Sequence, residues 1–83
     1  MTQYTLKTTP QEAEAIAKGN KSFVFRGVDQ PCGFGDYISF QVVDGKQMKR
    51  HAIERMKFVI TYVGTDAPIE RGFKVLGFRR VVA

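Results

Sequence analysis

The sequence has no tryptophan, one cysteine and one histidine among its 83 residues. With Cys32 as the only cysteine, no disulfide can form within the chain, and His51 alone leaves too few Cys and His ligands for a zinc site. No apolar run approaches the roughly 18 residues that a membrane-spanning helix needs, and the polar stretch after Met1 is unlike a signal peptide. We therefore expect no metal, no cofactor and no membrane anchor, with a cytoplasmic location as the default.

The apolar residues that are present suffice for one small core. Hydrophobic residues make up 43% of the chain and aromatic residues 12%, including seven Phe. A chain of this length buries only about 60 to 65% of its unfolded surface and cannot support two separate cores. We therefore predict a single domain over residues 1–83.

Positive charge is concentrated in the later part of the chain. Residues 1–44 carry four Lys/Arg and five Asp/Glu, a balance of −1, whereas residues 45–83 carry nine and three, a balance of +6. Such a concentration attracts phosphate groups through counterion release. Many small proteins are nevertheless basic without a nucleic-acid partner, so charge alone leaves polyanion binding open.

The first twenty residues predict a strand followed by a short helix. Tyr4–Lys7 alternates apolar and polar residues, as a half-buried strand does. The sequence Thr9-Pro10-Gln11-Glu12 predicts a capping box with proline at the first helical position. The helix should run to Lys18 and end at Gly19 in a left-handed conformation. Its buried face should contain Ala13, Ile16 and Ala17.

Four further strands are predicted, separated by loops rich in Gly, Pro and Asp. The first of them should place Phe23 and Phe25 on one face and Ser22, Val24 and Arg26 on the other. The third is expected to be a central strand covered on both sides. The four ranges are Ser22–Arg26, Tyr37–Val43, Met56–Val63 and Phe73–Val82.

Local signals add three details to this layout. Asp44-Gly45 favours a type I′ hairpin turn. Lys46–Arg55 suits either an edge strand or an irregular crossing, and we favour the irregular crossing. Gly77 indicates a bulge or bend in the last strand.

One helix and about five strands indicate an α+β domain with a strongly bent mixed sheet. An open sheet of this hydrophobicity would expose its edges to aggregation, and closure removes edges. We therefore predict a small β-barrel with one short N-terminal helix.

The segment Gly19-Asn20-Lys21-Ser22-Phe23-Val24-Phe25-Arg26 resembles the signature of ASCH-type domains, in which Gly-x-Lys leads into a strand that closes with Arg. The wider layout is similar to an uncharacterised, DUF3850-like subgroup of ASCH-related domains. This similarity rests on Phe34-Gly35-Asp36, on Val59–Val63 and on Gly72–Phe78. The resemblance spans nearly the whole chain.

The resemblance implies a PUA-like β-barrel with a cleft beside the motif and a role in binding RNA or a nucleotide. Some relatives are small amidohydrolases of acylated cytidine, in which the motif Lys acts with a Thr three residues later and a carboxylate elsewhere. The commoner pattern has Glu at that place, and here it is Val24. Catalysis by the family machinery is therefore doubtful; if it occurred, Lys21 and Glu70 would be the candidates.

Each candidate side chain also has a structural interpretation. Lys21 would complement the helix dipole or hold a phosphate at the mouth of the cleft. Arg26 would pair with a carboxylate such as Asp36 or Glu70, or clamp a phosphate or a base. The basic stretch from Lys46 to Lys57 is either a solvated face or a strip along a phosphate backbone.

The aromatic and nucleophilic candidates also have both a functional and a structural interpretation. Phe34, Tyr37 and Tyr62 could stack on bases, with core packing as the alternative. Cys32 lies in a loop without a clear base, which indicates a bystander thiol. His51 has no Ser or Cys partner at a recognisable spacing, so we interpret it as a surface or edge histidine.

Three functions remain open, and we favour an RNA- or nucleotide-binding module. The alternatives are a hydrolase of acylated cytidine and a protein-interaction module, with the oligomeric state undetermined. The predicted nucleic-acid-binding residues are Lys21, Ser22, Arg26, Phe34, Tyr37, Lys49, Arg50, Arg71 and Lys74.

Overall fold

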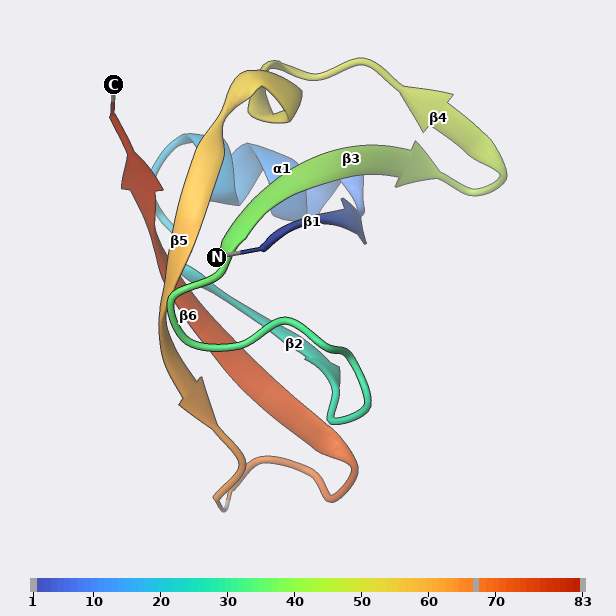
Figure 1. Cartoon of the computed structure of the whole chain (residues 1–83). Coiled ribbons are helices and arrows are strands. Elements are labelled where there is room, and N and C mark those ends of the chain that lie inside the picture. Colours follow the sequence, from blue (N-terminus) through green and yellow to red (C-terminus); the bar gives the residue numbers. More distant parts are fainter. Residues whose placement is uncertain (1, 67, 83) are drawn as a thin grey trace.

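The computed structural model describes residues 2–66 and 68–82 and shows a six-stranded mixed sheet with one α-helix and one 3-10 helix (Figure 1). This arrangement confirms the predicted α+β class. The elements are β1 (Gln3–Thr8), α1 (Pro10–Ala17), β2 (Phe23–Gly27), β3 (Tyr37–Asp44), β4 (Gln47–Lys49), η1 (Ala52–Arg55), β5 (Lys57–Gly64) and β6 (Phe73–Val81).

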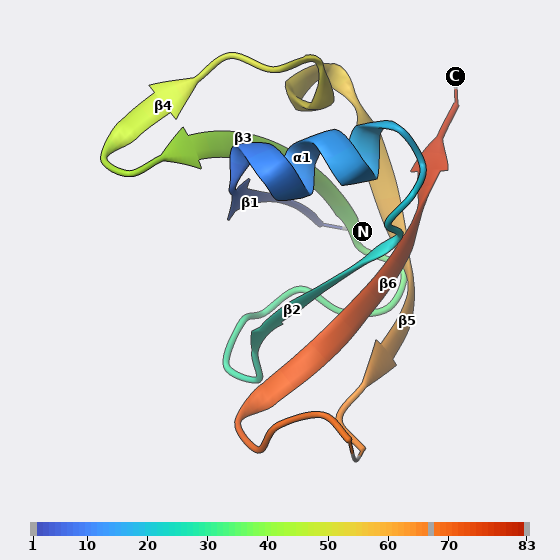
Figure 2. The same cartoon turned by 180° about the vertical axis from the view of Figure 1, so that it is seen from behind.

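The sheet is open, so the predicted barrel is wrong. Its strand order is β1-β3-β5-β6-β2, with β4 added to β3, and β1 and β2 form its two ends. Only β1 and β3 are parallel; the other pairs are antiparallel. In the part of the chain that the structure describes, no backbone ladder joins β1 to β2, and Figure 2 shows them as separate arms below α1. The gap between them is bridged by side chains, described below.

Helix α1 begins as its sequence predicts. The Glu12 amide donates a hydrogen bond of 3.2 Å to the Thr9 hydroxyl, and Pro10 occupies the first turn. The helix ends at Ala17, and the chain reverses at Gly19, whose φ of +81° is easily reached by glycine. Ala13 and Ile16 are buried and Ala17 packs against the core, as expected.

The segment after β3 combines both predicted alternatives: Gln47–Lys49 forms the short edge strand β4 in a hairpin with β3, and an irregular stretch then leads into η1. Asp44 remains in β3 and pairs with Gln47, so Gly45 and Lys46 form the centre of the turn. Only Gly45 has a positive φ, which is the pattern of a type II′ turn, whereas type I′ needs positive φ at both central residues. The pairing of Asp44 in the strand moved the turn by one residue.

The core lies on the face of the sheet that α1 and η1 cover. Phe40, Phe58 and Phe78 pack on one another with ring centroids 5.1 to 5.6 Å apart, largely in edge-on geometry. Val24 and Cys32 join this core, with 0% and 1% of their surfaces exposed. Cys32 therefore belongs to the core although it lies in a loop.

A register shift in β5 opposite Gly77 reverses which side chains face outward. Ile60 pairs with Phe78 and Tyr62 with Gly77, so Thr61 is an extra residue in β5. In a regular strand Tyr62 would share a face with Phe58 and Ile60, but the extra residue turns it outward, where it is 58% exposed. An irregularity does occur at Gly77 as predicted, but its extra residue lies in β5 and not in the last strand. The prediction that β5 is covered on both sides is wrong.

Candidate functional site

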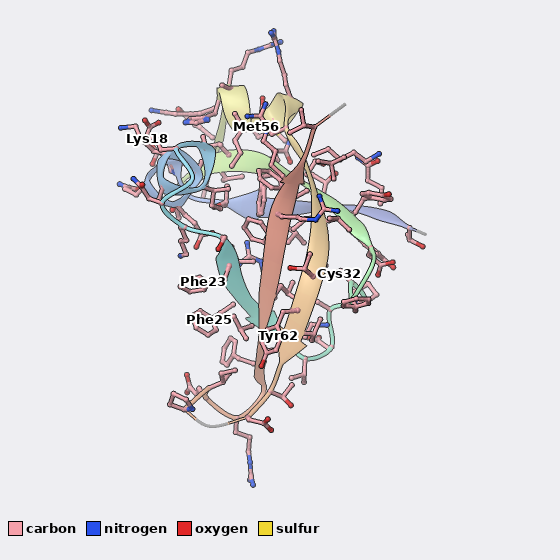
Figure 3. All side chains as sticks on the ribbon, turned by 90° about the vertical axis from the view of Figure 1, so that its left-hand side faces the viewer. Lys18, Phe23, Phe25, Cys32, Met56 and Tyr62 are labelled. Atoms are coloured by element: carbon pink, nitrogen blue, oxygen red, sulfur yellow. The ribbon has the colours of Figure 1, made fainter. Side chains whose placement is uncertain are left out.

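The candidate site is a hollow of about 230 Å³ between the C-terminal end of α1 and β6, which we call the basic hollow. Four of its lining side chains are cationic, and none that the structure describes is acidic. Lys18, labelled in Figure 3, marks the helical side of this region. The lining residues are Ile16, Ala17, Lys18, Gly19, Lys21, Ser22, Phe58, Phe78, Arg79 and Arg80.

Backbone hydrogen bonds bring the two sides of the basic hollow together. The amide of Lys21 donates to the carbonyl of Ala15, which folds the chain back onto the helix end. The amide of Phe78 donates to the carbonyl of Ser22 at 3.0 Å, which joins this turn to β6. The end of β6 thereby carries Arg79 and Arg80 to the turn that contains Lys21 and Ser22.

The four cations differ in their partners. Lys18 forms an ion pair with Glu14 at 3.2 Å and Lys21 one with Glu12 at 2.9 Å. Arg79 and Arg80 are exposed, and neither forms an ion pair with a carboxylate of residues 2–66 or 68–82. Their guanidinium groups are the cations of this hollow that a ligand can engage without displacing a carboxylate.

Lys21 also belongs to a second group, the seam cluster, which consists of Thr8, Glu12, Lys21 and Arg26. The Thr8 hydroxyl donates to one Glu12 oxygen at 2.6 Å, and the Lys21 ammonium donates to the other at 2.9 Å. Arg26 lies 3.8 Å from the first oxygen. One carboxylate is therefore shared by a hydroxyl and two cations.

Arg26 bridges the two ends of the open sheet. Its guanidinium donates to the carbonyl of Lys7 in β1 at 2.7 Å and to that of Phe25 in β2 at 2.6 Å. The expected ion pair with Asp36 or Glu70 is not formed, because Glu12 lies nearer and Asp36 accepts a bond from the Gly33 amide. The side chain takes the place of the backbone ladder that would have closed a barrel.

The electrostatics of the seam cluster favour an ionised Glu12. Burial alone would raise the pKa of this carboxyl, but the hydrogen bonds from Thr8 and Lys21, together with the charges of Lys21 and Arg26, lower it below the ordinary value of 4.5. The carboxylate is thus held in its charged form by the groups that surround it.

A hydroxyl, a carboxylate and an ammonium lie in one row here, the groups that an acyl hydrolase would need. Thr8 is only 6% exposed, however, which leaves its hydroxyl little room to reach a substrate. Val24, where the resemblance places Thr or Glu, lies in the core with 0% exposure. Glu12 supplies the carboxylate beside Lys21 instead. The predicted alternative, Glu70, lines an apolar groove beside Phe25 and Phe73.

Sequence reasoning missed Glu12 and Thr8 because the capping box already accounted for this stretch. It missed Arg79 and Arg80 because they lie at the end of the last strand, far in sequence from Lys21. The Arg-Arg dipeptide at the end of the last predicted strand was the signal in the sequence that could have identified them.

The remaining predicted residues are distributed over the molecule. Lys74 is 8% exposed, and its ammonium donates to the carbonyls of Gln30 at 2.6 Å and Cys32 at 2.9 Å, which holds that loop against β6. Lys49 forms an ion pair with Asp44 at 3.1 Å. Arg50 lines a separate hollow beside η1.

Two predicted aromatic residues and one arginine are likewise outside the basic hollow. Phe34 is 78% exposed in the loop before β3. Tyr37 lies under the Lys57 ammonium, 4.4 Å from the ring centroid. Arg71 is in the loop before β6. Of the nine predicted binding residues, the hollow contains Lys21 and Ser22, with Arg26 adjoining through Glu12; binding by any of the nine stays a prediction.

The contacts of His51 give it a structural role. Its Nδ1 accepts a hydrogen bond from the Ile53 amide at 3.0 Å, and its Nε2 lies 3.1 Å from a Glu14 oxygen. The hydrogen bond from His51, and then the bond and charge of Lys18, lower the pKa of Glu14. The residue caps η1 and ties it to α1.

The described residues contain neither a cluster of metal ligands nor a helix that could span a membrane. Residues 2–66 and 68–82 contain no group of three or more His, Cys, Asp or Glu placed to hold a metal ion. No helix in these ranges has the length and apolar character to cross a membrane.

Comparison with known proteins identifies a family model that matches residues 3–78, described as "Domain of unknown function (DUF3850)". No curated protein matches the chain. The matched region includes Lys21 and Arg26 and ends immediately before Arg79 and Arg80.

Proposed function

The chain belongs to the DUF3850 domain family, whose description names no activity, and from the geometry of the basic hollow we propose that it binds RNA or a nucleotide through phosphate. The observation that carries the proposal is a hollow lined by four cations and, among the residues described, by no carboxylate. The wider resemblance to ASCH and PUA-like domains supports the same function but is itself a prediction.

The chemistry of the lining groups suits a phosphate. An arginine can donate two parallel hydrogen bonds to phosphate oxygens. Arg79 and Arg80 line the hollow and form no ion pair with a described carboxylate, and Ser22 lines it as well. Lys21 contributes its charge while remaining bonded to Glu12. The floor of Phe58 and Phe78 is apolar, which strengthens electrostatic attraction by excluding water.

The surrounding strands extend the positive field beyond one phosphate. Strands β2, β5 and β6 together contain five Lys/Arg and no Asp or Glu. Lys74 is buried and Arg26 is bonded across the seam, so a polyanion approaching this part of the sheet meets the charges of Lys57, Arg79 and Arg80. This pattern favours a chain of phosphates over a single small anion.

Titration of a labelled single-stranded oligoribonucleotide at several salt concentrations tests the proposal. We expect Arg79→Gln and Arg80→Gln each to lower affinity about fivefold to tenfold and to reduce the slope of log affinity against log salt by about 0.7. Lys46→Gln is the control, because it removes the same charge from the tip of the β3–β4 hairpin. A mononucleotide competitor reports whether the hollow also accepts a single phosphate.

Two results would overturn the proposal. One is the absence of binding at low salt with micromolar protein. The other is an equal loss of affinity in Lys46→Gln and in the two arginine variants, since this would show a response to net charge alone.

A further inference from the structure

We propose that the outer face of β2, β6 and β5 stacks the bases of a single-stranded nucleic acid whose phosphates enter the basic hollow. This inference rests on the proposed function and extends it from phosphate to base contacts. The surface concerned, which we call the aromatic face, is defined by Phe23, Phe25, Tyr62 and Phe73.

Strand register places these four rings on one side of the sheet. Residues directly opposite one another in antiparallel strands point to the same face. Phe23 pairs with Gly77 and Gly77 with Tyr62, which forms one row across three strands. Phe25 pairs with Val75, and Gly27 with Phe73, in the next two rows. Figure 3 shows Phe23 and Phe25 projecting from β2 away from the side where Cys32 lies.

The rings are exposed to a degree that packing within the chain does not explain. Between 42% and 58% of each of the four residues is accessible to solvent. Phe23 and Phe25 contact one another edge to face, 5.8 Å between centroids, and leave their outer surfaces open. A contiguous exposed group of this kind marks an interaction site.

Two glycines shape the aromatic face for a flat ligand. A Cβ on Gly64 would lie 2.7 Å from the Tyr62 hydroxyl oxygen and 2.8 Å from its Cε2, so the ring lies directly against the backbone there. A Cβ on Gly77 would lie 3.2 Å from the Tyr62 Cβ. Gly77 also leaves the position between Phe23 and Tyr62 without a side chain. The result is a low platform between two rings, which suits a planar base.

Charge selects a nucleic acid as the occupant. The Lys21 ammonium lies 5.3 Å from the centroid of the Phe23 ring, and Arg79, two residues after Gly77 in β6, shares the outer face. Both residues also line the basic hollow, so the aromatic face and the hollow are contiguous. Aromatic rings beside positive charge are the usual surface for unpaired bases.

The exposed edge of β2 is less suited to a protein strand. The carbonyl of Phe25 already accepts a hydrogen bond from Arg26, and the carbonyl of Gly27 accepts one from the Gln30 amide. Addition of a strand from a second copy would have to displace these bonds. Contact through the rings alone is the protein alternative, and the experiment below separates it.

The native protein is titrated with a labelled oligouridylate and with an abasic strand of equal length. Both carry the same phosphates, but only the first carries bases. We expect the abasic strand to bind at least about tenfold more weakly, since stacking contributes substantially for each base. Tyr62→Ser and Phe23→Ser should lower affinity for oligouridylate about fivefold or more while leaving the abasic strand unaffected.

Controls isolate the role of the ring. Tyr62→Phe keeps the aromatic surface and should bind like the native protein. Val63→Ser removes the neighbouring exposed apolar side chain in β5 and should also leave affinity unchanged. Circular dichroism of each variant verifies folding, and the comparison of the two strands on the native protein needs no variant.

Each contrary outcome has a distinct meaning. Equal affinity for both strands, unchanged in Tyr62→Ser and Phe23→Ser, overturns base stacking and leaves phosphate binding in place. No binding of either strand removes the proposed function and this inference together. If the serine variants instead convert a dimer to a monomer in sedimentation measurements at unchanged affinity, the aromatic face is a protein contact.

Discussion

The seam cluster and the basic hollow share Lys21 and differ in what surrounds their cations. In the seam cluster, Arg26 is bonded to two backbone carbonyls and lies beside the Glu12 carboxylate. At the basic hollow, Arg79 and Arg80 have no such carboxylate among the described residues. A cation therefore holds the fold where acceptors already surround it, and is available to a ligand where they are missing.

Lys74 is the clearest example of a cation that is surrounded by acceptors. It is a predicted binding residue in the basic part of the chain, yet it is buried and its ammonium bonds to two loop carbonyls. We expect cations with acceptors to contribute stability and those without to contribute binding.

The largest effect is expected for Lys74→Met, which should lower the free energy of unfolding by about 2 to 3 kcal/mol. The substitution keeps much of the side-chain volume but leaves the carbonyls of Gln30 and Cys32 without their charged donor. Urea denaturation measures the change, with Lys46→Met as the exposed control. If Lys74→Met lost no more free energy of unfolding than Lys46→Met, the hydrogen bonds of Lys74 would not stabilise the fold and the distinction would fail.

An intermediate effect is expected for Arg26→Lys, which keeps the charge but cannot span the carbonyls of Lys7 and Phe25 with a planar fork. We expect a loss of about 1 to 2 kcal/mol. Arg80→Lys is the matched variant in the basic hollow and should leave stability unchanged. Thermal unfolding of Arg26→Lys and Arg80→Lys measures the difference in stability, and equal melting temperatures would contradict a structural role for Arg26.

The smallest effect concerns pH. The lowered pKa of Glu12 means that its ionised form stabilises the fold above pH 4.5, and that this stabilisation is lost as pH falls through the folded-state pKa. Glu12→Gln should therefore be less stable than the native protein near pH 7, with the difference shrinking toward pH 3. Denaturation of both proteins across this range measures the difference in stability. A difference that did not change with pH would show that the charge of Glu12 does not stabilise the fold.

Local rules in the sequence predicted most elements of secondary structure. The capping box at Thr9, the reversal at Gly19 and the alternation in β2 and β3 need only neighbouring residues, and all were confirmed. Errors arose where one element depends on another. The bulge at Thr61 turned Tyr62 outward, and the strand pairing of Asp44 moved the hairpin turn.

The candidate site was less accessible to prediction, for a related reason. Lys21 and Ser22 were identified from the motif, whereas Arg79 and Arg80 join them only because β2 pairs with β6. Glu12 was assigned to helix capping, and its side chain reaches Lys21 and Arg26 only in the folded chain. Its role could not be read from spacing along the sequence.

By itself, the sequence determined most of the elements, the start of the α-helix and its reversal at Gly19, the family and the excess of positive charge, because these depend on local pattern and composition. Tertiary structure alone decided that the sheet stays open and which cations are left without a partner. Both follow from distances between residues remote in sequence: Arg26 meets Lys7 across the open seam, and Arg79 meets no described carboxylate.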